Sequence, residues 1–449
     1  MDRTEVTERD GSDLADLQLF VVQLGAAMNA GGEPVYAVQE RLARIAAAYG
    51  APATTVSAFP TYLMVTMDRG APAAVEVTTP LASSLRLDQI AALERLLQDA
   101  ERGAVRPTDG VRRLTEIRLL RPRFGELQGI AGYSVMTMGL CLILHPAPLD
   151  VAAAAVFGAL VGLLRSFARS QPTLQVLMPV IAAFSVSALS ALAVREELLE
   201  PGLRAMVASL VVFLPGAALT TAVLELAAGQ MVSGSSRLVA GCVQLALLSF
   251  GILAGIEAVG IPSSRVLFGR ADLLGAWSPW LGVVVFALGV TVAHSAPTRA
   301  FPGLLVVLYA AWTAQVVGNA IFGGYVSALV GAMVMTIVAV LISRFPSAMP
   351  AHASFLPGFW LLVPGALGLI GLTELAGGGG GQDLVATVGS IFAVALGVLC
   401  GTQIVAWGVV TGRVVTDVSG SFSERHPRRK RRGSSGSTDF SSRAGDETV

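Results

Sequence analysis

Long apolar runs fill the chain from residue 125 to residue 412, whereas the first 124 residues mix polar and apolar positions. Ten of these runs have roughly the 17 to 25 residues that a helix needs to cross a bilayer. Backbone groups in hydrocarbon must bond within their own segment, which favours helices. The pattern therefore predicts an α-helical polytopic membrane protein with spans near 126–145, 151–168, 174–194, 203–227, 237–259, 276–293, 302–321, 324–343, 355–375 and 384–410.

The first 124 residues have the periodicities of a small α/β domain. Helices are predicted for DLADLQLFVVQLGAAMNA, for PVYAVQERLARIAAAYG, whose proline suits a first helical turn, and for LDQIAALERLLQDAERG. The segments TTVSAFPTYLMVTM and AAVEVTT have the alternation typical of strands. We expect a cytoplasmic α/β head domain over residues 1–124.

One stretch of the apolar region is written twice. LPGAALTTAVLELAAG (214–229) and VPGALGLIGLTELAGG (363–378) agree at seven of sixteen positions. LVAGCVQLALLSFGILAG (238–255) likewise resembles LVATVGSIFAVALGVLCG (384–401). Spans four and five thus correspond to spans nine and ten, which predicts two five-span repeats over 125–260 and 276–412. Because five is odd, the second repeat enters the membrane from the opposite side, as in the inverted repeats of secondary transporters.

Charge is concentrated at the two ends of the chain. Only 14% of the residues are charged, against roughly a quarter in a soluble protein. Residues 413–449 are rich in serine, glycine and arginine, and we expect this tail to be disordered. Its basic run RHPRRKRR suits contact with anionic membrane lipid or an orientation signal, and nucleic-acid binding is not expected.

The arginines predict the orientation of the spans. RRLTEIRLLRPR (112–123) precedes the first span with five arginines, which places that end in the cytoplasm. Other arginines follow the even-numbered spans, and the opposing ones are partly offset by nearby acids. Ten spans then place both termini in the cytoplasm of a bacterial cell, with a multi-pass protein in its plasma membrane.

Three acids stand out within or beside the spans. Glu225 and Glu374 lie ten residues after the prolines of the repeated stretch, and Glu257 lies late in span five. Burial of a charged group in a membrane is costly, so such acids are candidates for proton coupling or gating. The alternative is that each acid only ends a span at the membrane interface.

The repeated Pro-Gly pairs are candidate breaks that line a substrate pathway. Pro215 with Gly216, and Pro364 with Gly365, weaken a helix, and exposed backbone is tolerated in a membrane only against protein or a water-filled cavity. Ten helical residues rise about 15 Å. With the breaks at mid-depth, the first glutamate would lie near the inner face and the second near the outer face. Simple packing kinks are the alternative.

Four polar residues complete the candidate pathway. Gln315 and Asn319 in WTAQVVGNA are four apart and share one side of a helix, where they could hold substrate or join helices. Ser233 and Arg237 in SGSSR follow the first glutamate and could meet a carboxylate, or simply form a turn with an orienting arginine. No metal-ligand spacing is present, and we expect no metal or cofactor.

Several segments together resemble the bacterial threonine/serine exporter family, in its fused form with a head and ten spans. They are GAAMNAGGEPVYAVQERLARIAAAYG, GELQGIAGY, LPGAALTTAVLELAAGQMVSGSSRL and FLPGFWLLVPGALGLIGLTEL. The resemblance extends from about residue 15 to residue 410. It implies export of threonine and serine driven by the proton gradient, without fixing the binding residues. Some relatives divide the same plan between two chains.

We therefore expect an antiporter that exports threonine, serine or similar small amino acids, and not an enzyme. One alternative is an exporter of small dicarboxylates such as succinate, because divided relatives are associated with that activity. It would need cationic groups, and the sequence offers Arg165 and Arg237 near the inner face. The other alternative is a membrane-anchored enzyme or sensor acting through the head, although no catalytic motif is evident. A homo-oligomer stays open.

Overall fold

The computed structural model describes residues 3–67, 74–78, 84–169, 171–201, 203–267, 274–345, 348–362, 369, 373 and 388–407. Residues 1–403 form one compact unit and residues 404–449 another. Helices dominate the described residues, and the strands lie within the first 78 residues.

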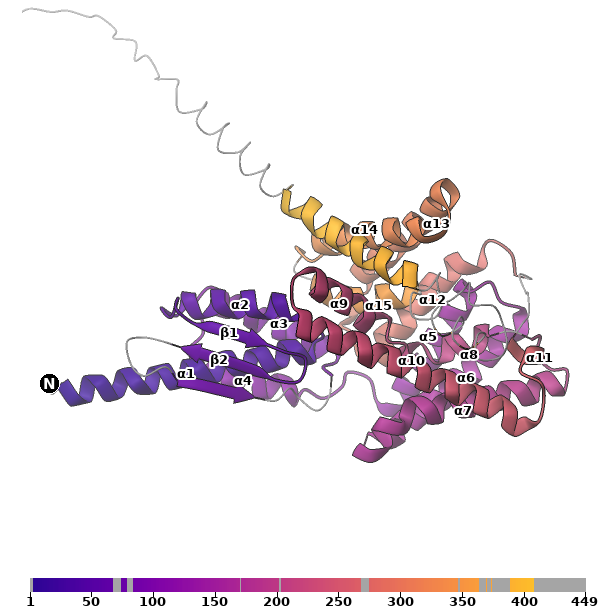
Figure 1. The fold of residues 1–449 in the computed structure, drawn as a ribbon, viewed down its shortest axis with the longest axis horizontal. Helices are drawn as coiled ribbons and strands as arrows, with labels where there is room; N and C mark the ends of the chain where they lie inside the picture. The colour runs from indigo at the N-terminus through magenta and orange to yellow at the C-terminus, as the bar shows by residue number, and fades with distance from the viewer. Residues whose placement is uncertain are drawn as a thin grey trace, which may run out of the picture. The chain divides into compact units, whose positions relative to one another are not determined.

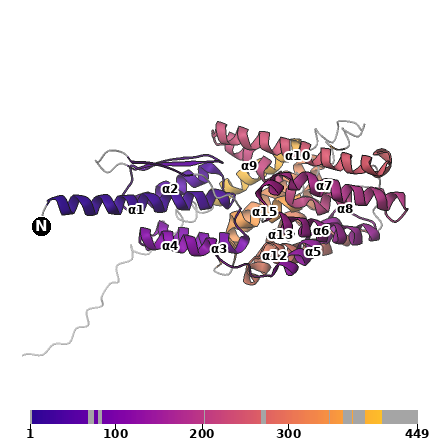
Figure 2. The same cartoon turned by 90° about the horizontal axis from the view of Figure 1, so that it is seen from below.

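The head contains helices packed on one face of a three-stranded sheet (Figures 1 and 2). The strands pair antiparallel in chain order, and along β2 buried and half-buried side chains alternate, so one face of the sheet is covered. The elements are α1 (Arg3–Ala30), α2 (Val35–Ala48), β1 (Thr55–Ala58), β2 (Leu63–Met67), β3 (Ala74–Thr78), α3 (Leu87–Glu101) and α4 (Pro107–Arg118). Helix α4 was not expected, because its arginines were interpreted only as an orientation signal.

The position of α2 in the head is fixed by apolar packing and by charge. Its apolar positions Val35, Val38 and Leu42 are fully buried in the core of the head. On its other side, the Arg41 guanidinium contacts carboxylates of α3, at 2.8 Å from Glu94 and 3.0 Å from Glu101. Burial of Glu94 acts to raise the pKa of its carboxyl group, but the hydrogen bonds and the charge of Arg41 outweigh burial. The pKa of Glu94 is therefore lowered. The start of α2 is therefore held by the whole domain.

Beyond the head, apolar helices follow the predicted spans closely. Six described helices are long and apolar enough to cross a membrane: α5 (Glu126–Ile143), α6 (Pro148–Ala168), α7 (Pro172–Arg195), α10 (Met231–Val259), α13 (Phe301–Phe322) and Val388–Trp407. Shorter helices occupy the other runs: α8 (Arg204–Ser209), α9 (Gly216–Ala227), α12 (Ser278–Ala293), α14 (Gly324–Ile342) and α15 (Ala351–Leu362), with the short α11 (Ser264–Leu267) between the halves.

The run 203–227 is broken, as its Pro-Gly pair predicts. Helix α8 ends at Ser209, a single 3₁₀ turn covers Val211–Phe213, and α9 begins at Gly216 with Pro215 as its N-cap residue. The second Pro-Gly pair lies outside the described residues.

Helices α5 and α12 pack through glycines that contact the partner helix's backbone. A Cβ on Gly139 would collide with the backbone nitrogen of Phe286, and a Cβ on Gly289 would collide with that of Met136. Gly289 and Phe286 lie 150 positions after Gly139 and Met136, so the two contacts are reciprocal. As the residue number rises in one helix it falls in the other, and the pair is antiparallel.

A second correspondence links two other helix pairs. Gly251 of α10 packs against the carbonyl of Val180 in α7, and Gly397 packs against that of Leu329 in α14. Gly251 and Gly397 are equivalent positions of the repeated sequence. Their partners Val180 and Leu329 are 149 positions apart in the sequence, and so are the neighbouring contact residues Ala183 and Ala332. The same close helix contact therefore occurs once in each half.

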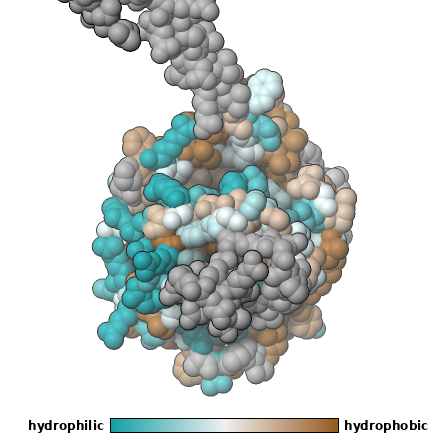
Figure 3. Space-filling model, turned by 90° about the vertical axis from the view of Figure 1, so that its left-hand side faces the viewer, coloured by the Kyte–Doolittle hydropathy of each residue, from teal (hydrophilic) through white to brown (hydrophobic). Residues whose placement is uncertain are grey.

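Surface polarity differs between the head and the helices beyond it. Figure 3 views the head end, where hydrophilic residues gather and hydrophobic ones lie toward the edges. Along the apolar helices, large side chains such as Val176, Phe250 and Ile321 are mostly exposed. Such an apolar exterior is the surface that lipid chains cover in a membrane protein.

Candidate functional site

Glu225 lies at the centre of a charged cluster. Its side chain is 0% exposed near the end of α9. Both carboxylate oxygens accept hydrogen bonds from Nε of Arg237, each at 3.1 Å. A buried carboxylate requires such a partner, because an isolated buried charge is strongly disfavoured. The interpretation that SGSSR supplies an arginine to a carboxylate agrees with this contact.

The turn between α9 and α10 brings these two residues together. Gly229 adopts a φ of 80°, a backbone conformation that glycine tolerates best, and α10 begins two residues later. Gly234 of α10 lies so near α9 that a Cβ there would sit 2.8 Å from the carbonyl oxygen of Ala222. The two helices therefore run closely side by side, which places Arg237 over Glu225.

The head supplies a third contact to the same carboxylate. The backbone N–H of Val35, the first residue of α2, donates to Oε1 of Glu225 at 3.0 Å. One turn later, the side-chain amide of Gln230 donates to Oε1 of Gln39 at 2.9 Å. The start of α2 thus sits directly on the turn between α9 and α10.

The head also contacts the second half of the chain. Oε1 of Glu33, just before α2, lies 3.7 Å from Nε2 of His352 at the start of α15. Burial raises the pKa of Glu33, while the charges of His352 and Arg41 act to lower it. Neither of the two facing atoms has a hydrogen-bond partner among the described residues. Nearby, the backbone N–H of Leu87 donates to the carbonyl of His294, just after α12.

The remaining sequence candidates do not join this cluster. Ser233 is buried in the first turn of α10, whereas Glu257 is exposed near the far end of that helix. Gln315 is half-buried beside Gly331, with no hydrogen-bond partner for its Oε1 among the described residues, and Asn319 is exposed. The four-residue spacing of the last two therefore does not give them a shared environment.

Three candidates, Glu374, Pro364 and Gly365, lie outside the described residues. Thr373, which directly precedes Glu374, is described and fully buried. Its hydroxyl donates to the hydroxyl of Ser249 in α10 at 3.2 Å. Thr373 therefore lies beside α10, the helix that carries Arg237.

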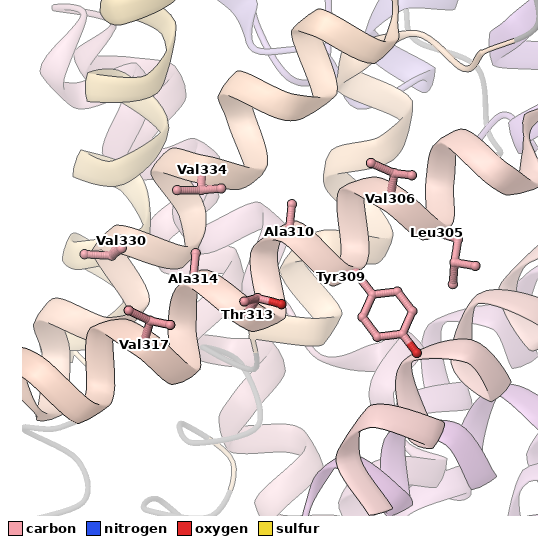
Figure 4. Close-up of a pocket in the computed structure, with 9 residues that line it drawn as sticks. All are labelled: Leu305, Val306, Tyr309, Ala310, Thr313, Ala314, Val317, Val330 and Val334. Carbon is pink, nitrogen blue, oxygen red and sulfur yellow. The ribbon is translucent and has the colours of Figure 1, made fainter. Parts of the chain in front are cut away.

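A groove of about 700 Å³ lies between α13 and α14 (Figure 4). Its lining is almost wholly aliphatic, and the two oxygens among the side chains in Figure 4 belong to Tyr309 and Thr313. The Tyr309 hydroxyl already donates to the carbonyl of Trp280. Such a lining leaves the charged groups of an amino acid without partners, so this groove does not suit such a substrate.

Arg165, a candidate cation for dicarboxylates, lies at the α5–α6 contact. Its guanidinium carbon is 5.5 Å from the centre of the Tyr133 ring, in cation–π geometry. The Tyr133 hydroxyl donates to the carbonyl of Ser209 at 2.8 Å, beside the broken segment. No cluster of three metal-ligating side chains occurs within the described part of the chain.

Comparison with known proteins decides the family. Residues 19–259, more than half of the chain, match the family model ThrE, described as "Putative threonine/serine exporter". The chain belongs to this family. It is therefore a multi-pass membrane protein of a transporter family, in agreement with its apolar helices. No curated protein and no solved structure gives a significant match.

The family match begins in the head, at residue 19, and extends past Glu225 and Arg237. The family model therefore includes both the head and the charged cluster. Sequence reasoning identified Glu225 and Arg237 but missed Val35, Gln39 and His352. The available signal was GGEP before α2, which predicts a helix start but not what that start contacts.

Proposed function

We propose that this protein exports threonine, serine or similar small amino acids across the bacterial plasma membrane, driven by the proton gradient. The observation that carries the proposal is the fully buried Glu225, paired with Arg237 next to a broken helix. A carboxylate that alternates between an arginine partner and a proton can couple proton entry to substrate exit.

Reciprocal helix contacts support an inverted repeat of five and five spans. In a two-fold arrangement, equivalent residues exchange contacts across the axis, as Gly139 with Phe286 and Gly289 with Met136 do. The antiparallel direction of α5 and α12 is the one expected for an axis lying in the membrane plane. The two halves would then rock about this contact to open the pathway alternately to each side.

The head contacts support cytoplasmic termini. The head meets the end of α9, the end of α12 and the start of α15. The arginine pattern assigns those three helix ends to the cytoplasmic side. The sidedness of the head and the orientation of the spans are thus consistent with each other.

The test is efflux from cells that lack their own exporters and are loaded with threonine, serine or succinate. We expect threonine and serine efflux above the vector control, abolished by a protonophore. Glu225→Gln should lower this efflux about tenfold or more, because the amide cannot take up and release the coupling proton. Glu126→Gln, at an exposed position opening α5, is the control for a lost carboxylate.

Membrane levels of each variant are measured alongside efflux. Succinate efflux alone would replace the amino-acid substrate with a dicarboxylate. Unchanged, proton-dependent efflux in Glu225→Gln would rule out this residue as the coupling acid. No efflux of any of the three from wild-type protein in the membrane would favour an activity of the head itself.

A further inference from the structure

The head is attached to both halves of the transporter at one end. It contacts the first half through Val35 at Glu225 and Gln39 at Gln230. It contacts the second half through Glu33 at His352 and through the Leu87 amide on the carbonyl that follows α12. A folded domain fastened to both halves at the same end holds that end together.

We propose that the head is the inner gate of the pathway and that a proton on Glu225 releases it. The head closes the inner end while α2 begins on the ionised carboxylate, and it moves away when that carboxylate becomes neutral. This proposal rests on the proposed export function, which determines which molecule passes through the gate. The docking of the head on Glu225 can be measured without any substrate.

The contact itself explains why a proton would release the head. The first N–H groups of a helix have no partner inside the helix, and the positive end of the helix dipole favours an anion there. The Val35 N–H and the Arg237 guanidinium both face the Glu225 carboxylate, and the Tyr36 side chain of α2 lies near it. A neutral acid attracts the helix start and the guanidinium less strongly.

Proton binding and head docking therefore oppose each other. By linkage, if protonation of Glu225 weakens the docking equilibrium by some factor, docking weakens proton binding to Glu225 by the same factor. This ordering suits exchange of an incoming proton for an outgoing substrate. A proton that arrives from the outer side neutralises Glu225 and opens the inner gate. The proton then leaves to the cytoplasm while substrate binds. The head docks again on the ionised carboxylate and closes the gate.

Docking is measured by cross-linking the Gln39–Gln230 contact in membranes. Both residues are replaced by cysteine and the exposed Cys242 by serine. A short cross-linker with two thiosulfonate groups is applied to the full-length protein; each cysteine thiolate displaces a sulfinate and forms a disulfide that can later be reduced. We expect rapid cross-linking in this background. Addition of Glu225→Gln, which mimics the neutral acid, should slow it about tenfold, whereas Glu126→Gln, at an exposed position opening α5, should leave the rate unchanged.

A second variant isolates the amide contact in case Glu225→Gln fails to insert. Val35→Pro removes the N–H that reaches Glu225, and proline is tolerated at the first position of a helix because no internal hydrogen bond is lost. Val35→Ala keeps the N–H and loses most of the buried side chain, so it is the matched control. Slower cross-linking in Val35→Pro than in Val35→Ala is the expected result.

Efflux is then measured on the cross-linked protein before and after reduction. We expect the locked head to stop efflux and reduction to restore it. Full efflux with the head locked, or cross-linking that is indifferent to both Glu225→Gln and Val35→Pro, would overturn the gate. If the reduced protein exports none of the offered substrates while cross-linking still responds to the two substitutions, the export function fails and the proton-released docking stands.

Discussion

At the scale of single residues, two buried carboxylates lie where the head contacts the apolar helices, and their charges are compensated differently. Glu225 has an arginine and a backbone amide within hydrogen-bond distance, so its charge is compensated. Glu33 has His352 at 3.7 Å and no hydrogen bond to its Oε1 from the described residues. The second carboxylate is therefore the less stable of the two when ionised, and its protonation affects how firmly the head is held.

Glu33 gives a prediction about pH. Burial raises its pKa above the ordinary carboxyl value of 4.5, so the folded protein binds this proton more tightly than the unfolded chain. The stabilisation is complete below pH 4.5 and is lost as the pH rises through the raised pKa. In purified protein, Glu33→Gln should therefore gain melting temperature over wild type at pH 8 but not at pH 4, by roughly 1 °C per kcal/mol, because the entropy of unfolding grows with chain length.

The control for this comparison is Glu40→Gln, on the helix that follows Glu33, at an exposed position paired with the neighbouring Arg44. It should melt like wild type at both pH values. An equal melting temperature for Glu33→Gln and wild type at pH 8 would show that the buried carboxyl carries no such penalty.

At the scale of elements, glycine decides how closely the helices approach. The α5–α12 contact places the backbone of each helix against glycines of the other, and where α10 meets α7 the glycines of α10 face the backbone of α7. In lipid, the hydrophobic effect does not drive helices together. Close backbone packing is therefore a main source of helix association in a membrane. These contacts hold α5 and α12 together as a close antiparallel pair.

We expect Gly139→Ala and Gly289→Ala each to destabilise the protein by about 1–3 kcal/mol, because the added methyl group must push a backbone away. Gly129→Ala on the same α5 helix meets no atom within 4 Å and should be neutral. The measurement is the fraction of monodisperse protein left after heating in detergent. The double substitution should lose less than the sum, since one shift of the helices relieves both collisions. Fully additive losses would argue against a reciprocal contact.

At the scale of the whole molecule, the proposed repeat divides the helices into two halves joined between α10 and α12, and the head contacts both. The contact between α5 and α12, and that between Thr373 and Ser249, cross from one half to the other without using the connection. The connection itself is therefore not required to hold the halves together.

A chain divided after Gly260 should still assemble. Residues 1–260 and 261–449, expressed as two polypeptides, should co-purify and restore at least roughly half of the wild-type efflux, while neither piece alone should export. The close backbone packing of α5 against α12 provides the driving force. Co-expression of the first piece carrying Gly139→Ala is the control, and it should reduce the recovered complex. Independent stability of each piece with no co-purification would contradict this assembly.

Much of this protein follows from its sequence because local physics determines it. Apolar length predicts the helices beyond residue 125, and Pro-Gly predicts the break before α9. The short separation of Glu225 and Arg237 across one turn makes their pairing foreseeable. Periodicity likewise placed α2 and its start at Pro34, because a helix start depends on neighbouring residues.

Only the tertiary structure decided what that helix start contacts. Val35 and Glu225 are 190 positions apart, and no local pattern encodes which buried carboxylate will face an unpaired N–H. The approach depends on the salt bridges that fix α2 in the head and on the glycine contacts that bring α9 against α10. The same holds for Glu33 and His352, which come from opposite ends of the chain and meet through the packing of the head on both halves.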